Sequence, residues 1–170
     1  MATKTATKTF DNLFLDTLKD LYYAEKKILT TLPKMAKAAN AQELAAAFEK
    51  HRDQTEMQVE RLERIFEMLG KRAQGKTCPA IDGIIEEGQE IMDDYKSSPA
   101  LDAGLLAAAQ AVEHYEITRY GTLKRWAEVM GMSEAALLLD ETLQEESQTD
   151  EDLSALADLK VNAEALTNAA

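Results

Sequence analysis

The chain has 170 residues, the size of one domain, and it is rich in helix-forming residues with only 7 Gly and 3 Pro. So few turn residues, together with the lack of Val/Ile-rich runs, argue against all-β and doubly wound α/β folds. A formal net charge of −12 disfavours sequence-independent binding to nucleic acids and anionic membranes, and it favours cations as partners. No apolar run is long enough for a membrane span, and the first ten residues lack the apolar segment of a secretory signal, so we expect a cytoplasmic protein.

The sequence predicts a short tail followed by helices. Residues 1–8 are rich in Thr, Lys and Ala and have no apolar face, which predicts a mobile tail. Gly70 fits the position after a last helical turn, and Ser133 is typical of an N-cap. Apolar residues at helical spacing predict helices over Thr9–Ala38, Ala41–Gly70, Ala80–Tyr95, Ala100–Met130 and from Ser133 to about Leu166.

Four of these helices are long, and the shorter one lies in the connection between the second and the third. Two helical hairpins joined by a long crossover predict an all-α, ferritin-like four-helix bundle in a single domain spanning residues 9–166. A weak internal repeat supports this division, because it aligns Glu25 with Glu116 and His51 with Glu145. The two hairpins therefore look like duplicated halves.

Every long helix interrupts its inward apolar line with polar residues near its middle. In an antiparallel bundle these middles lie at similar heights, so the interruptions are expected to meet in one layer. Four carboxylates cannot all be ionised in a low-dielectric core, and they must share protons, admit water or surround a cation. The predicted members of this layer are Glu25, His51, Glu113, Glu116 and Glu145.

The residue types of this layer suit a metal site. Oxygen-rich ligands with an imidazole favour Fe, Mn or Zn. Glu113 and Glu116 are three residues apart on one helical face, as a bridging or chelating pair requires, whereas His114 lies about 200° around the helix from Glu116 and is expected to point away. The alternative is a buried polar network that fixes helix register without a metal, with His51 bonded to a carboxylate.

Four segments resemble the ferritin-like family of bacterial stress proteins typified by YciF, over a stretch from Thr9 to about Leu166. The resemblance implies a ferritin-like bundle, a homodimer and a carboxylate-rich metal site. The segments are FDNLFLDTLKDLYYAEKKI, FEKHRDQTEMQVERL, AAAQAVEHYEITRYGTL and LLLDETLQEESQTD, and VEHYEITRYGTL is the most specific part.

The sequence departs from better-known di-iron proteins, which carry Glu-x-x-His on two helices. Phe48 stands three residues before His51, and Gln148 stands three residues after Glu145. Gln54 occupies a position where members of the resembled family often carry Glu. The predicted site therefore has fewer anionic ligands and one well-placed imidazole.

Two functions follow from these observations. The first is a stress-response protein with a dinuclear iron or manganese site that consumes an oxidant. The second is a non-enzymatic, dimeric helical protein whose buried polar layer is structural. The single cysteine, Cys78, excludes an intramolecular disulfide and any multi-cysteine metal site, and its place beside Pro79 in a loop is compatible with an exposed, oxidisable thiol.

Overall fold

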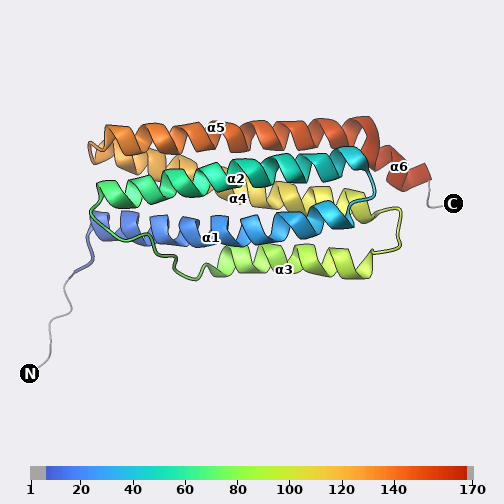
Figure 1. Cartoon of the computed structure of the whole chain (residues 1–170), viewed down its shortest axis with the longest axis horizontal. Coiled ribbons are helices and arrows are strands. Elements are labelled where there is room, and N and C mark those ends of the chain that lie inside the picture. Colours follow the sequence, from blue (N-terminus) through green and yellow to red (C-terminus); the bar gives the residue numbers. More distant parts are fainter. Residues whose placement is uncertain (1–6, 168–170) are drawn as a thin grey trace, which may run out of the picture.

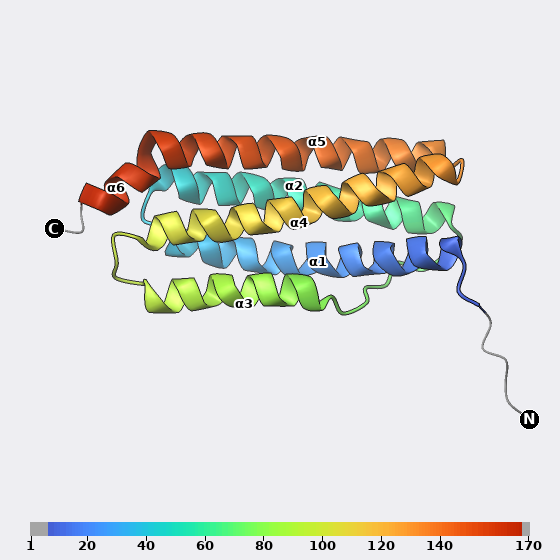
Figure 2. The same cartoon turned by 180° about the vertical axis from the view of Figure 1, so that it is seen from behind.

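The computed structural model describes residues 7–167 of the chain, and these residues form an elongated helical bundle (Figure 1). Four long helices lie side by side, and a shorter helix packs on the outside against two of them (Figure 2). In chain order the elements are α1 (Phe10–Ala38), α2 (Gln42–Met68), α3 (Pro79–Asp94), α4 (Leu101–Val129), α5 (Ser133–Leu156), the π-helical turn η1 (Ala157–Val161) and α6 (Asn162–Thr167).

The topology is the predicted one. Helices α1 and α2 form one hairpin and α4 and α5 form the other, while α3 lies in the crossover and packs against α1 and α4. This is the all-α, ferritin-like arrangement of two hairpins with one long connection. No helix in the described part of the chain is long and apolar enough to cross a membrane.

The helix ends follow from local chemistry. Thr9 and Asn12 form a reciprocal capping box at the start of α1. Gly70 and Gly131 adopt positive φ angles of 63° and 73° after α2 and α4, where a residue with a Cβ would be strained. The cap predicted at Ser133 was wrong, because Ser133 is already the first residue of α5 and the N-cap position falls on Met132 without a side-chain bond.

The chain termini differ in how far they can be described. Residues 1–6 of the predicted mobile tail lie outside the described part of the chain. Within it, Lys8 forms an ion pair with Asp16 on α1, with 2.8 Å between Nζ and Oδ2. At the other end, the helix predicted to continue to Leu166 changes to π-helical geometry over Ala157–Val161 and then resumes as α6.

The core consists of two apolar clusters separated along the bundle axis by a polar layer. On α1, Leu18 and Leu21 belong to one cluster and Ile28 and Leu32 to the other, with Glu25 between them. The other long helices repeat this order. The interruption predicted from the sequence is therefore a buried layer between two conventional hydrophobic cores.

Cys78 is buried at the start of α3, so the expectation of an exposed thiol was wrong. The residue is 1% exposed and its Sγ lies 3.2 Å from the Tyr115 hydroxyl of α4. Although Cys78 lies at the end of a loop, α3 packs this end of the loop against the bundle and covers the thiol. The thiol is part of the core rather than of the surface.

Asp102, at the start of α4, links the two hairpins through its carboxylate. Its carboxylate accepts hydrogen bonds from the backbone N–H groups of Asn40 and Ala41, at 2.8 and 2.7 Å, immediately before α2 begins. Both N–H groups lie where a helix start leaves backbone donors without intrahelical partners. Asp102 therefore caps α2 from another helix.

We expect Asp102→Ala to lower the free energy of unfolding by about 2 kcal/mol, since it leaves two backbone donors without acceptors. Urea denaturation measures the change. Asp94→Ala, an exposed acid at the end of α3, is the control and should change stability by less than about 0.5 kcal/mol. Equal effects of the two substitutions would contradict the capping role.

Candidate metal centre

The polar layer contains eight buried residues drawn from all four long helices. On each helix these polar residues lie on the same face as the apolar core residues that precede and follow them. Their side chains therefore point into the interior of the bundle. These residues are between 0% and 3% exposed. The members are Glu25, His51, Thr55, Gln58, Glu113, Glu116, Thr142 and Glu146.

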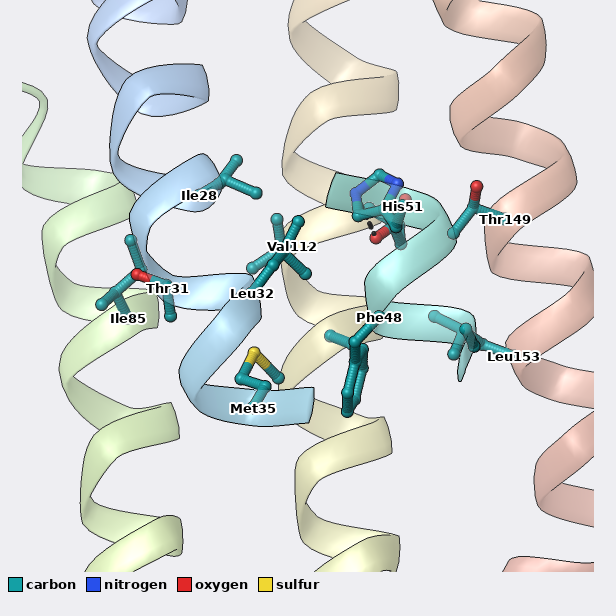
Figure 3. Close-up of a pocket in the computed structure, with 13 residues that line it drawn as sticks. Ile28, Thr31, Leu32, Met35, Phe48, His51, Ile85, Val112, Thr149 and Leu153 are labelled. Atoms are coloured by element: carbon teal, nitrogen blue, oxygen red, sulfur yellow. Dashed lines mark ion pairs between the residues drawn. The ribbon is translucent and has the colours of Figure 1, made fainter. Parts of the chain in front are cut away.

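Four of these residues converge on one point. His51 of α2, Glu113 and Glu116 of α4, and Glu146 of α5 each offer a ligand atom, and these atoms all lie within 4.8 Å of one another. Nε2 of His51 is 3.3 Å from Oε1 of Glu113, and the dashed line in Figure 3 marks this pair. The same nitrogen lies 4.0 Å from Oε2 of Glu116 and 3.9 Å from Oε2 of Glu146.

Glu25 adjoins this group from α1. Its Oε1 accepts a hydrogen bond from the hydroxyl of Tyr120, one helical turn beyond Glu116 on α4. The carboxyl groups of Glu25 and Glu116 lie close enough for each to shift the pKa of the other. The layer thus holds four acids and one imidazole. Tyr120 holds one of the acids, Glu25, in place through its hydrogen bond.

Burial is the main cause of the shifted pKa values in the layer. It raises the pKa of Glu25 to about 7 and the pKa of Glu113 to about 8, and it raises those of Glu116 and Glu146 well above their ordinary value. The negative charges of neighbouring acids reinforce the rise for Glu116 and Glu146. Burial also lowers the pKa of His51 to about 4, so its ring is neutral near pH 7 and free to act as a ligand.

The structure does not bring Glu145 into the cluster, and its predicted place in the buried layer was wrong. Its side chain is 26% exposed, whereas that of Glu146 is fully buried. Arg61 of α2 holds Glu145 through two hydrogen bonds of 2.7 and 2.8 Å, and Gln58 donates a third of 3.1 Å. Burial alone would raise the pKa of Glu145, but the bonds from Arg61 and Gln58 outweigh it and leave that pKa below its ordinary value.

Glu146 is the residue that the sequence analysis missed, and a signal for it was present. Leu139, Glu146 and Leu153 are seven residues apart, and all three are buried on α5. A heptad step from either leucine therefore lands on Glu146 rather than on Glu145. Glu145 is the adjacent acid, and a step of seven residues from Leu138 leads to it instead.

The remaining sequence expectations concern neighbours of the layer. His114 points away from it, because its side chain is 70% exposed and lies 3.3 Å from Asp150. Gln148 is exposed and bonds to Asp152. Gln54 has a buried Oε1 atom with no hydrogen-bond partner. Gln54 is therefore a neutral, partly buried amide at a position where members of the resembled family often carry Glu.

The cluster lacks the partners that a self-sufficient polar network would provide. Within the part of the chain that the structure describes, both ring nitrogens of His51 and both carboxyl oxygens of Glu116 and of Glu146 are buried without a hydrogen-bond partner. One oxygen each of Glu25 and Glu113 is in the same state. Buried polar atoms are normally paired, and a metal ion would satisfy several of these at once. The residues present thus fit a cation held by carboxylates and an imidazole.

Comparisons with known proteins agree on one family. The family model "Domain of unknown function (DUF892)" matches residues 9–166. Protein YciF of Escherichia coli strain K12 is 42% identical over 159 residues, which cover 93% of this chain and 96% of YciF. The crystal structure of the Escherichia coli stress protein YciF superposes with a TM-score of 0.87 at 41% identity, covering 92% of this chain and 99% of that one.

Two further solved structures are similar. YcfI from Rhodopseudomonas palustris is 41% identical, with a TM-score of 0.84 over 90% of this chain and 98% of its own. A protein from Xanthomonas campestris is 23% identical, with a TM-score of 0.67 over 88% of this chain and 92% of its own, and it shares the fold.

Proposed function

Because this chain belongs to the DUF892 family and encloses an acid cluster without a counter-charge of its own, we propose that it is a metal-binding stress protein. The observation that carries the proposal is the convergence of His51, Glu113, Glu116 and Glu146 with unpartnered oxygen and nitrogen atoms. Arg61, the one arginine that is buried among the described residues, is paired with Glu141 and Glu145. A cation is the remaining way to hold these acids ionised at neutral pH.

The donor set favours iron or manganese, with zinc as a competitor. Carboxylates and a neutral imidazole suit these ions, whereas an all-oxygen cage would suit magnesium or calcium. Glu25 is close enough to Glu116 to shift its pKa, and it would extend the set toward a second ion and a dinuclear site. Glu25 and Glu116 would hold that second ion together, and Tyr120 orients Glu25 by donating a hydrogen bond to its Oε1.

A redox-active pair of this kind would supply electrons to an oxidant such as dioxygen or a peroxide. The protein's own residues would exclude bulk water, since all five side chains are buried. His51 stays neutral, and the raised pKa values of the acids allow them to hold protons when no cation is present. A cytoplasmic location and a homodimer remain predictions from the sequence.

The test compares two adjacent residues of α5. Glu146→Gln removes a cluster ligand, and we expect it to reduce bound metal by at least tenfold, because an amide oxygen is a far weaker ligand than a carboxylate. Glu145→Gln is the matched control and is expected to retain metal at the wild-type level. Protein prepared with added iron or manganese is desalted, and metal per chain is measured by mass spectrometry.

Two outcomes would contradict the proposal. Wild-type protein with well under one ion per chain after loading with either metal would leave the layer as a structural network. Equal metal in wild type and Glu146→Gln would place the ion elsewhere. Consumption of peroxide by anaerobically loaded ferrous protein, followed optically, then tests the oxidant-consuming role separately from binding.

A further inference from the structure

Polar contacts join α2 and α5 where these two helices pass the acid cluster. Nε2 of Gln58 donates to Oε2 of Glu145 at 3.1 Å, and the guanidinium of Arg61 donates to both oxygens of Glu145 at 2.7 and 2.8 Å. At the cluster itself, Nε2 of His51 lies 3.9 Å from Oε2 of Glu146. These contacts define the α2/α5 seam, and polar groups follow it from Glu145 to the cluster.

Glu145 contacts solvent at this seam and also lies near the buried layer. Its side chain is 26% exposed, and its hydrogen bonds keep its pKa below the ordinary value despite burial, so it is ionised at neutral pH. Burial is the largest cause of the raised pKa values of Glu25 and Glu146, and the negative charge of Glu145 adds to both rises. Glu145 is therefore a charged group at the surface whose field extends into the layer.

Two amide oxygens on α2 lie along the seam without a partner. Gln54 and Gln58 are four residues apart on one face of the helix, and the Oε1 atom of each is buried without a hydrogen bond among the described residues. Gln58 is 0% exposed, and its Oε1 belongs to the amide that donates to Glu145. Buried polar atoms are normally paired, and amide oxygens are ordinary ligands of divalent cations. The two oxygens thus point to a cation as their partner.

Arg61 places a cation of the protein's own beside Glu145. Its side chain is 9% exposed, and it also donates to Glu141 at 2.7 Å and to Oγ1 of Thr142 at 3.2 Å. A metal ion that binds Glu145 has to displace the guanidinium from this carboxylate. Glu141 and Thr142 can still hold Arg61 when that happens, so the exchange does not leave a buried charge unpaired.

We propose that a divalent cation enters the acid cluster along the α2/α5 seam, with Glu145 as the first carboxylate that binds it and the amide oxygens of Gln58 and Gln54 as the next ligands. Arg61 competes with the incoming ion for Glu145 and slows its entry. This inference rests on the proposed function, because a path requires a site at its end. It gives a role in loading to residues that are not ligands of the cluster.

Cobalt(II) added to metal-free, full-length protein tests the path, because its visible absorption intensifies in a site of oxygen and nitrogen ligands. Glu145→Gln is expected to lower the rate of cobalt uptake by about tenfold or more and to leave the final metal per chain unchanged. Asp150→Asn is the matched control. Asp150 is also an acid of α5, 21% exposed, but it pairs with His114 on the side of α4. Its replacement removes the same charge and should leave uptake at about the wild-type rate.

Arg61→Gln is expected to have the opposite effect on the rate. It frees Glu145 and should speed cobalt uptake by about threefold or more. A purely structural role of the ion pair predicts that both substitutions loosen the seam and speed uptake, so slower uptake by Glu145→Gln separates the two roles. If Glu145→Gln does not fold, as judged by circular dichroism, Gln58→Leu removes an amide oxygen of the path and should slow uptake to a similar degree.

Rate and final amount separate this inference from the proposed function. Equal uptake rates for wild type and Glu145→Gln, or an equal slowing by Asp150→Asn, would overturn the path and leave the metal site in place. Faster uptake by Glu145→Gln would also overturn the path. Wild-type protein that takes up no cobalt, iron or manganese would overturn the metal site and the path together.

Discussion

Metal-free protein is expected to lose on the order of 4 kcal/mol of unfolding free energy as the pH rises from 5 to 9. The pKa of Glu25 is raised to about 7 and that of Glu113 to about 8 in the folded state, and the ordinary value of 4.5 applies to the unfolded chain. Between these values the folded protein binds more protons than the unfolded chain, so stability falls as the pH rises. The pKa values of Glu116 and Glu146 are also raised well above their ordinary value, so these acids add to the decline.

His51 acts in the opposite sense at lower pH. Its folded-state pKa is lowered to about 4 from 6.5, so the folded protein binds fewer protons than the unfolded chain between these values. The stability that the neutral ring contributes is present above pH 6.5 and is lost as the pH falls toward 4. We therefore expect the metal-free protein to be most stable at mildly acidic pH.

Urea denaturation at several pH values, with chelator present, measures this profile. The metal-loaded protein is the control. The difference in unfolding free energy between metal-loaded and metal-free protein should grow with pH, because the ligands must lose their protons to bind the ion. A flat profile for metal-free protein between pH 5 and 9 would show that the acids are hydrated rather than buried as the structure has them.

Replacing one buried acid by an apolar side chain is expected to stabilise the metal-free protein and abolish its metal binding. Glu116 is 0% exposed, and neither of its carboxyl oxygens has a hydrogen-bond partner among residues 7–167. Methionine has a similar shape and removes this unpaired polar group, so Glu116→Met should raise the free energy of unfolding by about 2 kcal/mol at pH 8. The gain should shrink at pH 5, where the wild-type acid is protonated.

Glu151→Met, an exposed acid on α5, is the control and should alter stability by less than about 0.5 kcal/mol. The same comparison separates the two functions considered from the sequence. A structural polar network would lose stability when Glu116 is replaced. Destabilisation of metal-free protein by more than about 1 kcal/mol would therefore favour the structural role.

Much of the fold could be predicted because its signals are local. The five principal helices begin and end within about two residues of the expected positions, apart from the π-helical turn after Leu156. Apolar periodicity and the stop at Gly70 carry this information in the sequence itself. The geometry at Ala157–Val161 leaves no comparable mark, since its residues are ordinary helix formers.

The candidate site could be predicted only as far as helical phase allows. Glu25, His51, Glu113 and Glu116 lie on faces whose apolar neighbours define the phase clearly. On α5 the heptad line through Leu139 and Leu153 indicates Glu146, but it does not show that Glu145 pairs with Arg61 of another helix. Such a pairing across about 80 positions of sequence exists only after the hairpins have packed together.

The reactivity of the buried thiol of Cys78 can report local opening of the bundle. Its sulfur lies beneath the start of α3, against Tyr115, so a thiol reagent reaches it only when α3 moves away from α1 and α4. Because it is the single cysteine of the sequence, the labelling rate reports that one movement without any engineered residue. The same shielding keeps two folded copies from becoming joined through a disulfide when an oxidant is present.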